Sequence, residues 1–550
     1  MKFNWNNPYP TIRVPVMGRS IVATSHPYAA QAGLRMMQCG GNAIDAAIAA
    51  AAVLMIVEPV SNGLGSDCFS IIWDGKELHG LNSSGVAPNR WSPDYFSAKY
   101  GVDANGLANR PVRGWDTVTI PGALAGWEAM YARFATLPFE ELLQPAIEIA
   151  ERGYFLTPVV AHKWAAAIPD LKNQPGFSDA FMPNGRAPNT GELFQFETAA
   201  AALKRIAKVG VRDFYEGEIA QSIIDFSKSG GGAMTMDDLA SFQPDWVGTI
   251  KQSCLGADGK TYSMHEIPPN GQGIGALMAL GILNHFDLQN LPLDSAESQH
   301  LQIEAMKLAF ADVYKYVADA RSMAVTPEQM LDPNYLSGRA TLIDPTKATH
   351  FDYGLPNTGG TVYLTTADEQ GRMVSFIQSN YMGFGSGIVV PKWGVSLQNR
   401  GYGFSMDIKS PNVVSGGKRP FHTIIPAFLM REEGNKSIPQ MSFGVMGGDM
   451  QPQGHLQTLI RMLTYSQQPQ AACDAPRWKV NRDFTLDVES NMNASTVQKL
   501  IDMGHVLKKI DDPYMDFGAG QFIWRLGDDV ETHGYLAASD SRRDGLVAAY

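Results

Sequence analysis

The sequence has few cysteines and none of the short motifs that mark the commonest hydrolases. Its four cysteines (Cys39, Cys68, Cys254 and Cys473) lie far apart with no CxxC spacing. A disulfide framework or a zinc site is therefore not expected. The chain also contains no G-x-S-x-G, H-E-x-x-H or Walker A sequence, so serine-hydrolase, metalloprotease and phosphate-loop interpretations lose their simplest support. We expect neither a metal nor an organic cofactor.

Positive charge and long apolar runs are scarce as well. The 550 residues include 44 Lys and Arg against 55 Asp and Glu, a net charge of −11, and no basic run, so nucleic acid is not an expected partner. Residues 1–8 show no apolar signal segment. The most apolar stretch, 43–57, contains Asp45 and is too short to span a bilayer. These features predict a cytoplasmic enzyme without a membrane partner.

The order of elements indicates an α/β protein. Gly40 and Gly41 end one expected helix, and Asn42 can cap the apolar helix that follows. Residues 270–275 predict a tight turn before a packed helix, although a Gly-rich anion-binding loop is the alternative. The expected strands are 20–24, 68–73 and 77–82, and the expected helices are 27–39, 43–57, 121–134, 138–152, several within 198–228, and an amphipathic one at 295–319.

The composition and the expected secondary structure of the chain change near residue 360. Polar, Gly- and Pro-containing sequence at 326–360 predicts a loop, and strands at 362–366 and 373–379 follow it at once. A flexible connector that runs straight into a central hairpin is an odd place for a domain linker. It is a sensible place for a cleavage junction.

Gly359, Gly360 and Thr361 stand at this junction. By itself the tripeptide is a common way to begin a strand. In a self-cleaving precursor, however, a hydroxyl attacks the carbonyl just before it, and glycine leaves that peptide uncrowded. After cleavage, Thr361 would carry a hydroxyl nucleophile and an α-amine with a pKa near 8, which can act as its base.

The motifs around this junction resemble those of the γ-glutamyltransferase family. The downstream matches are 383–389 (GFGSGIV), 397–405 (LQNRGYGFS), 417–426 (GKRPFHTIIP) and 444–449 (GVMGGD). The upstream matches are 40–46 (GGNAIDA), 58–59 (EP), 63–66 (GLGS), 120–123 (IPGA) and 144–146 (QPA). These ordered matches cover essentially the whole chain.

The resemblance implies a fold, a processing event and a set of catalytic residues. The fold is a four-layer αββα sandwich of the N-terminal-nucleophile hydrolase type. Cleavage between Gly360 and Thr361 would give a large subunit, 1–360, and a small subunit, 361–550, which stay associated because both contribute strands to the same sheets. The family pattern makes Thr361 the nucleophile, Gly447 and Gly448 the oxyanion hole, and Ser379 a support for the nucleophile.

Departures from the family pattern concern the substrate. Ser84 stands where glutamyl-specific members carry an arginine, and Gly403 stands where they carry an acidic residue. Both charged contacts to a glutamyl group are thus missing. Arg400 stands where those members carry glutamine, and arginine can bind a carboxylate through two hydrogen bonds. The predicted substrate-binding residues are Arg400, His422, Thr423, Asn399, Tyr381 and Ser84.

The sequence therefore predicts a self-processing amidohydrolase acting on a small amide of a short acidic acyl group, glutaryl- or oxamate-like. The alternatives are a γ-glutamyl hydrolase or transferase acting on glutathione-type amides, a non-enzymatic relative and a serine hydrolase. A structural salt bridge is the other interpretation of Arg400. His300 and Glu304 share a helix face, which favours a structural contact over a metal site. The oligomeric state, a homo-oligomer included, stays open.

Overall fold

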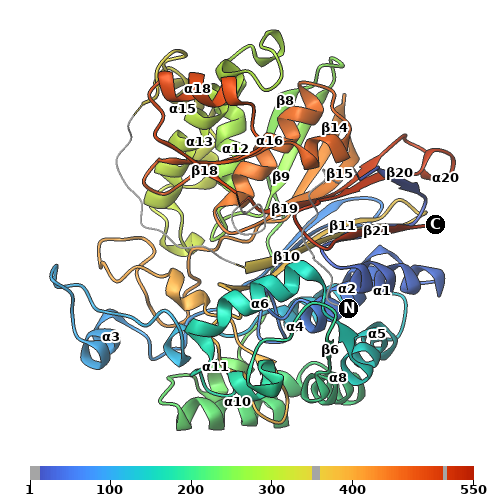
Figure 1. The fold of residues 1–550 in the computed structure, drawn as a ribbon, viewed down its shortest axis with the longest axis vertical. Helices are drawn as coiled ribbons and strands as arrows, with labels where there is room; N and C mark the ends of the chain where they lie inside the picture. The colour runs from blue at the N-terminus through green and yellow to red at the C-terminus, as the bar shows by residue number, and fades with distance from the viewer. Residues whose placement is uncertain (1–12, 350–359, 512–516) are drawn as a thin grey trace.

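Two seven-stranded antiparallel sheets form the centre of the molecule (Figure 1). The structure is a computed structural model that describes residues 13–349, 360–511 and 517–550. The first sheet has the strand order β1 (Val16–Gly18), β20 (Tyr535–Ser539), β19 (Ala519–Arg525), β15 (Lys436–Met446), β14 (Ala427–Glu433), β9 (Thr261–Glu266) and β8 (Ile250–Leu255). The second has the order β21 (Leu546–Ala549), β2 (Ile21–Thr24), β10 (Gly360–Ala367), β11 (Met373–Tyr381), β3 (Asp67–Trp73), β4 (Leu78–Ser83) and β7 (Asp245–Trp246).

Helices cover the outer face of the second sheet. The layer comprises α1 (Pro27–Gln38), α2 (Ala43–Val57), α4 (Ala123–Phe134), α5 (Phe139–Arg152), α6 (Pro158–Leu171), α8 (Glu197–Val209) and α10 (Glu218–Ser229). Asn42 caps α2 by accepting from the N–H groups of Ile44 and Asp45, while the Asp45 carboxylate accepts from the N–H of Asn42. Every residue of α2 is buried, because the helix lies between β10, β11 and α5.

A second helical layer covers the outer face of the first sheet. Its main members are α12 (Gly273–Leu283), α13 (Ala296–Tyr316), α15 (Pro333–Ala340), α16 (Met450–Leu463), α17 (Pro469–Asp474) and α18 (Ala494–Asp502). A small sheet of β16 (Trp478–Val480), β17 (Leu486–Glu489) and β18 (Leu507–Ile510) lies beside them. Because α12 and α16 are apolar toward β8, β9 and β15, this layer has its own core.

A third core joins the two sheets face to face. Phe69 and Tyr363 of the second sheet pack here against Phe428 of the first sheet. The Tyr363 hydroxyl also lies 2.7 Å from Ser375 Oγ, so this polar group is satisfied inside the core. Helix, sheet, sheet and helix thus form four layers, and the predicted αββα sandwich is confirmed.

Segments on both sides of position 360 build both sheets. In the second sheet β10 pairs with β2, and β11 pairs with β3. In the first sheet β14 pairs with β9, and β20 pairs with β1. Breaking the chain before Thr361 would therefore leave the two segments joined by strand ladders in both sheets.

Most expected elements are confirmed, with boundaries shifted by a few residues. The loop predicted at 326–360 is partly wrong, since it contains α14 (Pro327–Met330) and α15. Asp332 caps α15, Pro333 suits its first turn, and Leu336 is buried in the α12 layer. The sequence did not indicate α15 because only two of its residues, Leu336 and Ala340, are buried, so the helix has no clear apolar pattern.

The helix at 295–319 is confirmed as α13, but it is not amphipathic. His300, Glu304 and Lys307 are all buried, because α13 packs against α12, α16 and α18. These three side chains pair with one another or with His505 instead of facing water. Among the residues that the structure describes, no helix combines the length and the apolar character needed to cross a bilayer.

Candidate active site

Thr361 lies at the start of β10, in the middle of the second sheet, and is 3% exposed. Its Oγ1 lies 3.1 Å from Ser379 Oγ on β11. The main-chain N–H of Tyr381 donates to the same Ser379 oxygen over 2.8 Å. The strand register shifts between Gly360 and Val362, so β11 has one extra residue opposite Thr361. Such a bulge redirects side chains, and here it brings the predicted nucleophile and its predicted support into contact.

Gly447 and Gly448 form the turn between β15 and α16. Their φ angles are +127° and +58°, in the region that residues with a side chain rarely adopt. A Cβ on Gly447 would also lie 2.7 Å from the Cα of Gly518. This turn therefore requires glycine, and the role of the two amide groups as an oxyanion hole stays a prediction.

Arg400 is fully buried in a short 3-10 helix, η5 (Arg400–Gly403). Its Nη1 donates to Thr423 Oγ1 over 2.9 Å, and its guanidinium carbon lies 4.1 Å from the centre of the Tyr381 ring. Within the described part of the chain, its Nε and Nη2 have no hydrogen-bond partner. Burial lowers the pKa of Arg400 to about 10, so it is still charged at neutral pH. The hydrogen bonds of a structural salt bridge are not present among these residues.

His422 contacts Asp67, a residue that the sequence analysis missed. His422 Nε2 lies 3.1 Å from Asp67 Oδ2, and both side chains are fully buried. The main-chain N–H of Ile424 donates to His422 Nδ1, so the proton sits on Nε2. Burial raises the pKa of Asp67 to about 7, although the charge of Arg400 acts in the opposite direction. Burial and the same arginine lower the pKa of His422 well below its usual value.

Asn399 and Ser84 have their side chains engaged within the protein. Asn399 Nδ2 donates to the carbonyl oxygen of Val112 over 3.0 Å, and its Oδ1 accepts from the N–H of Met382 over 3.2 Å. Ser84 Oγ donates to Asn82 Oδ1 over 2.8 Å. Both residues fix loops around the site, and their contact with substrate stays a prediction.

Tertiary contacts reveal further residues that the sequence analysis overlooked. The side chain of Gln272 bridges the loops that carry Thr423 and Gly448. Arg482 forms two hydrogen bonds with Asp449, which directly follows the glycine pair, over 2.7 and 3.0 Å. The turn expected at 270–275 does precede α12. Gln272 within this turn was the sequence feature that could have pointed to the bridge. Nothing in the local sequence marks Arg482.

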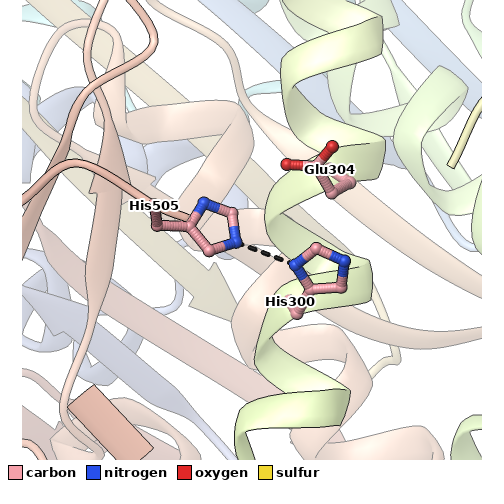
Figure 2. Close-up of side chains that lie close together, drawn as sticks. All are labelled: His300, Glu304 and His505. Carbon is pink, nitrogen blue, oxygen red and sulfur yellow. Dashed lines mark hydrogen bonds between the residues drawn. The ribbon is translucent and has the colours of Figure 1, made fainter. Parts of the chain in front are cut away.

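The pair His300 and Glu304 belongs to a buried hydrogen-bond network with His505 (Figure 2). His300 Nε2 lies 2.8 Å from the carbonyl oxygen of Asp344, which only accepts, so this nitrogen carries the proton. His300 Nδ1 then accepts from His505 Nε2 over 2.8 Å.

The Lys307 ammonium completes this network. It donates to Glu304 over 2.8 Å and lies 3.3 Å from His505 Nδ1. A positive charge already occupies the space between the side chains that would ligate a metal, and the lone pairs of both imidazoles face donors. The geometry therefore favours the structural contact over a cation site.

Comparison with known proteins identifies the family of this chain. The profile of the gamma-glutamyltranspeptidase family matches residues 29–550. The chain belongs to the gamma-glutamyltranspeptidase family. It is therefore an N-terminal-nucleophile hydrolase, a class of enzymes that hydrolyse amides or transfer acyl groups, as the motif order predicted.

Similar family members differ in their named activities. The structure of a cephalosporin acylase from Bacillus halodurans superposes with a TM-score of 0.92 at 42% identity, covering 100% of this chain and 99% of that one. A glutathione hydrolase-like proenzyme of Bacillus subtilis is 32% identical over 96% of this chain and 98% of its own. An oxamate amidohydrolase proenzyme of Klebsiella pneumoniae is 31% identical over 97% and 99%.

Proposed function

We propose that this chain is a precursor that cleaves its own Gly360–Thr361 bond and then hydrolyses amides of a short acidic acyl group. The contact between Thr361 Oγ1 and Ser379 Oγ at the start of a central strand carries the proposal. The names of similar proteins as proenzymes support self-cleavage. Cleavage would yield a large subunit, 1–360, and a small subunit, 361–550.

Self-cleavage needs a hydroxyl next to an unhindered carbonyl. Thr361 Oγ attacks the carbonyl carbon of Gly360, its proton passing to a neighbouring base or water. The C–N bond then breaks, the nitrogen takes a proton, and the acyl group is left on the hydroxyl as an ester. Water hydrolyses this ester to a Gly360 carboxylate and a free Thr361. Ser379 supports the first step, because its oxygen is held by the Tyr381 N–H beside Thr361 Oγ1.

Amide hydrolysis uses the same hydroxyl with a new base. The free α-amine of Thr361 accepts the hydroxyl proton while Oγ attacks the substrate carbonyl. Gly447 and Gly448 N–H groups stabilise the negative oxygen. The C–N bond of the substrate breaks, the leaving amine takes the proton, and an acyl-enzyme remains. Water then releases the acid and restores the hydroxyl. Acyl transfer to another amine is the less favoured route.

The acidic acyl group follows from Arg400. Its guanidinium is buried, charged and lacks partners for Nε and Nη2 among the described residues. A carboxylate would supply the missing acceptors through two parallel hydrogen bonds. Tyr381 links this arginine to the nucleophile, because its ring stacks on Arg400 and its N–H reaches Ser379. A glutaryl or oxamate-type acyl group fits this arrangement.

Intact mass and N-terminal sequencing of purified wild-type protein and of Thr361→Ala test self-cleavage. We expect wild type to yield a fragment beginning Thr-Val-Tyr-Leu, whereas the variant stays intact and inactive. Thr361→Ser, which keeps a hydroxyl, should still cleave. Full amide hydrolysis by an unbroken wild-type chain would overturn the proposal.

A panel of amides tests the substrate class. Glutaryl-p-nitroanilide and oxamate should be turned over faster than γ-glutamyl-p-nitroanilide and glutathione. Arg400→Ala should raise KM for the acidic amides by about 10- to 100-fold, since one charge-assisted interaction is lost. Preferential turnover of the γ-glutamyl compounds would instead favour the alternative, a γ-glutamyl hydrolase or transferase.

A further inference from the structure

A second arginine, Arg110, approaches the short helix that carries Arg400 from a different loop. The guanidinium carbon of Arg110 lies 4.6 Å from the centre of the Tyr402 ring. Tyr402 belongs to η5, the same short helix that begins with Arg400. The hydrogen bond from Asn399 Nδ2 to the carbonyl oxygen of Val112 fixes the Arg110 loop against this helix. Two arginines distant in the chain thus converge on one end of the candidate site.

Arg110 has unused hydrogen-bonding capacity. Its Nη1 atom is buried and has no hydrogen-bond partner within the described residues. Arg400 is in the same situation with two of its nitrogens. Tyr402 contacts the face of the Arg110 guanidinium and also interacts with it through a side-chain hydrogen bond, so Nη1 is the donor that still lacks an acceptor among the described residues. A buried donor without an acceptor costs free energy. A bound carboxylate or carbonyl group would therefore be stabilised at each arginine.

The surrounding charges do not neutralise these two arginines. Arg482 also lies near, but Asp449 holds it through two hydrogen bonds. Asp67 interacts with Arg400 through its charge and has no direct hydrogen bond to it. Burial lowers the pKa of Arg110, with Tyr402 and Tyr381 acting in the opposite direction. Near Tyr381 and Tyr402, therefore, two cations lack a direct anionic partner among the residues that the structure describes.

We propose that Arg110 is a second carboxylate-binding residue and that the preferred substrate carries two carboxylates, one at Arg400 and one at Arg110. The inference rests on the proposed amidohydrolase function and narrows its substrate class from acidic to dianionic amides. Arg110 is a specificity-determining residue in this scheme and takes no part in proton transfer.

The second carboxylate can stand on the acyl group or on the leaving amine. Three substrates separate these arrangements. Glutaryl-glycinamide has one carboxylate. Glutaryl-glycine has a second one on its leaving amine, and tricarballyl-glycinamide has a second one on its acyl group. Initial rates of wild type, Arg110→Gln and Arg110→Lys give kcat/KM for each substrate, and melting temperatures check that the variants are folded.

The proposal predicts a difference in selectivity. Wild type should prefer one of the dianionic amides over glutaryl-glycinamide by about tenfold or more, and the preferred one identifies where the second carboxylate lies. Arg110→Gln should abolish this preference, whereas Arg110→Lys should keep part of it. Arg90→Gln, which removes an exposed arginine, should retain it. Equal selectivity in wild type and Arg110→Gln would overturn the proposal.

A binding measurement separates this inference from the proposed reaction. Calorimetric titration with glutarate and with tricarballylate gives their ratio of Kd without requiring turnover. If no amide is cleaved but Arg110→Gln still loses the tighter binding of tricarballylate, the reaction is wrong and the carboxylate site stands. If cleavage occurs and neither selectivity nor binding depends on Arg110, the site is wrong and the reaction stands.

Discussion

The side-chain amide of Gln272 donates a hydrogen bond to the carbonyl oxygen of Gly448 over 2.9 Å. The same nitrogen also donates to the carbonyl oxygen of Thr423 over 2.7 Å. Gly448 belongs to the predicted oxyanion hole, and the Thr423 hydroxyl accepts from Arg400. One buried amide thus fixes the loop that would stabilise the transition state to the loop that would hold the substrate.

Replacing Gln272 should slow catalysis more than it weakens binding. Gln272→Ala removes both hydrogen bonds and leaves the Gly448 carbonyl with only the N–H of Gln451 as a donor, so the glycine turn loses its link to the Thr423 loop. We expect kcat to fall by about 10- to 100-fold with a smaller change in KM. Steady-state kinetics on glutaryl-p-nitroanilide measures both parameters.

Two controls sharpen this prediction. Gln272→Glu preserves the shape of the side chain but replaces the donor with an acceptor, and it should be as slow as Gln272→Ala. The exposed Gln498→Ala should behave as wild type. A large rise in KM with unchanged kcat in Gln272→Ala would show that the amide does not position the oxyanion hole.

Asp67 should make substrate affinity depend on pH. The pKa of this buried carboxyl is raised to about 7, and its charge interacts with Arg400. Below this pH Asp67 is neutral, so the charge of Arg400 is fully available to a substrate carboxylate. Above it, ionised Asp67 offsets that charge. We expect KM for acidic amides to rise roughly three- to tenfold as the pH increases through about 7.

Asp67→Asn tests the origin of this pH dependence. The amide cannot ionise, so KM in the variant should stay flat across the same interval. His422 does not contribute, because burial keeps its pKa well below this range. An equal rise in KM in Asp67→Asn would assign the ionisation to another group.

Asp540 should be critical for stability. It is fully buried and accepts hydrogen bonds from Arg477 over 2.8 Å, from Arg542 over 3.0 Å, and from the N–H of Gly520 over 2.8 Å. The charges of the two arginines hold its pKa below the usual range. Asp540→Asn leaves these buried cations undercompensated and should destabilise the protein by about 3–5 kcal/mol.

Urea unfolding of the purified variants measures this effect. The exposed Asp502→Asn provides the matched control and should change stability by about 0.5 kcal/mol or less. A similar small change in Asp540→Asn would mean that the arginines find other partners.

The network of His300, Glu304 and His505 should be indifferent to metals. Lys307 already supplies the positive charge that this cluster holds. We expect EDTA and added zinc to leave the melting temperature unchanged, whereas His505→Ala should lower it by removing a buried hydrogen-bond partner. A clear rise in melting temperature with stoichiometric zinc would contradict the hydrogen-bonded assignment.

The sequence by itself determined the local features of this protein. The cap at Asn42, the hairpin of β3 and β4, and the buried run of α2 follow from residue types at short spacing. The ordered motifs also indicated Thr361, Gly447 and Gly448 as candidates, since each motif is contiguous. Glycines at positive φ and apolar runs can be interpreted in this way because their causes lie within a few residues.

Only the tertiary structure decided which side chains meet. Ser379 reaches Thr361 because a bulge in β11 lies opposite it, and the bulge depends on strand pairing. The approach of Arg110 to Tyr402 and the bridge from Gln272 to Gly448 join loops from distant parts of the chain. The burial of Lys307 in α13 has the same origin. Such contacts arise from the packing of whole layers, and no local spacing encodes them.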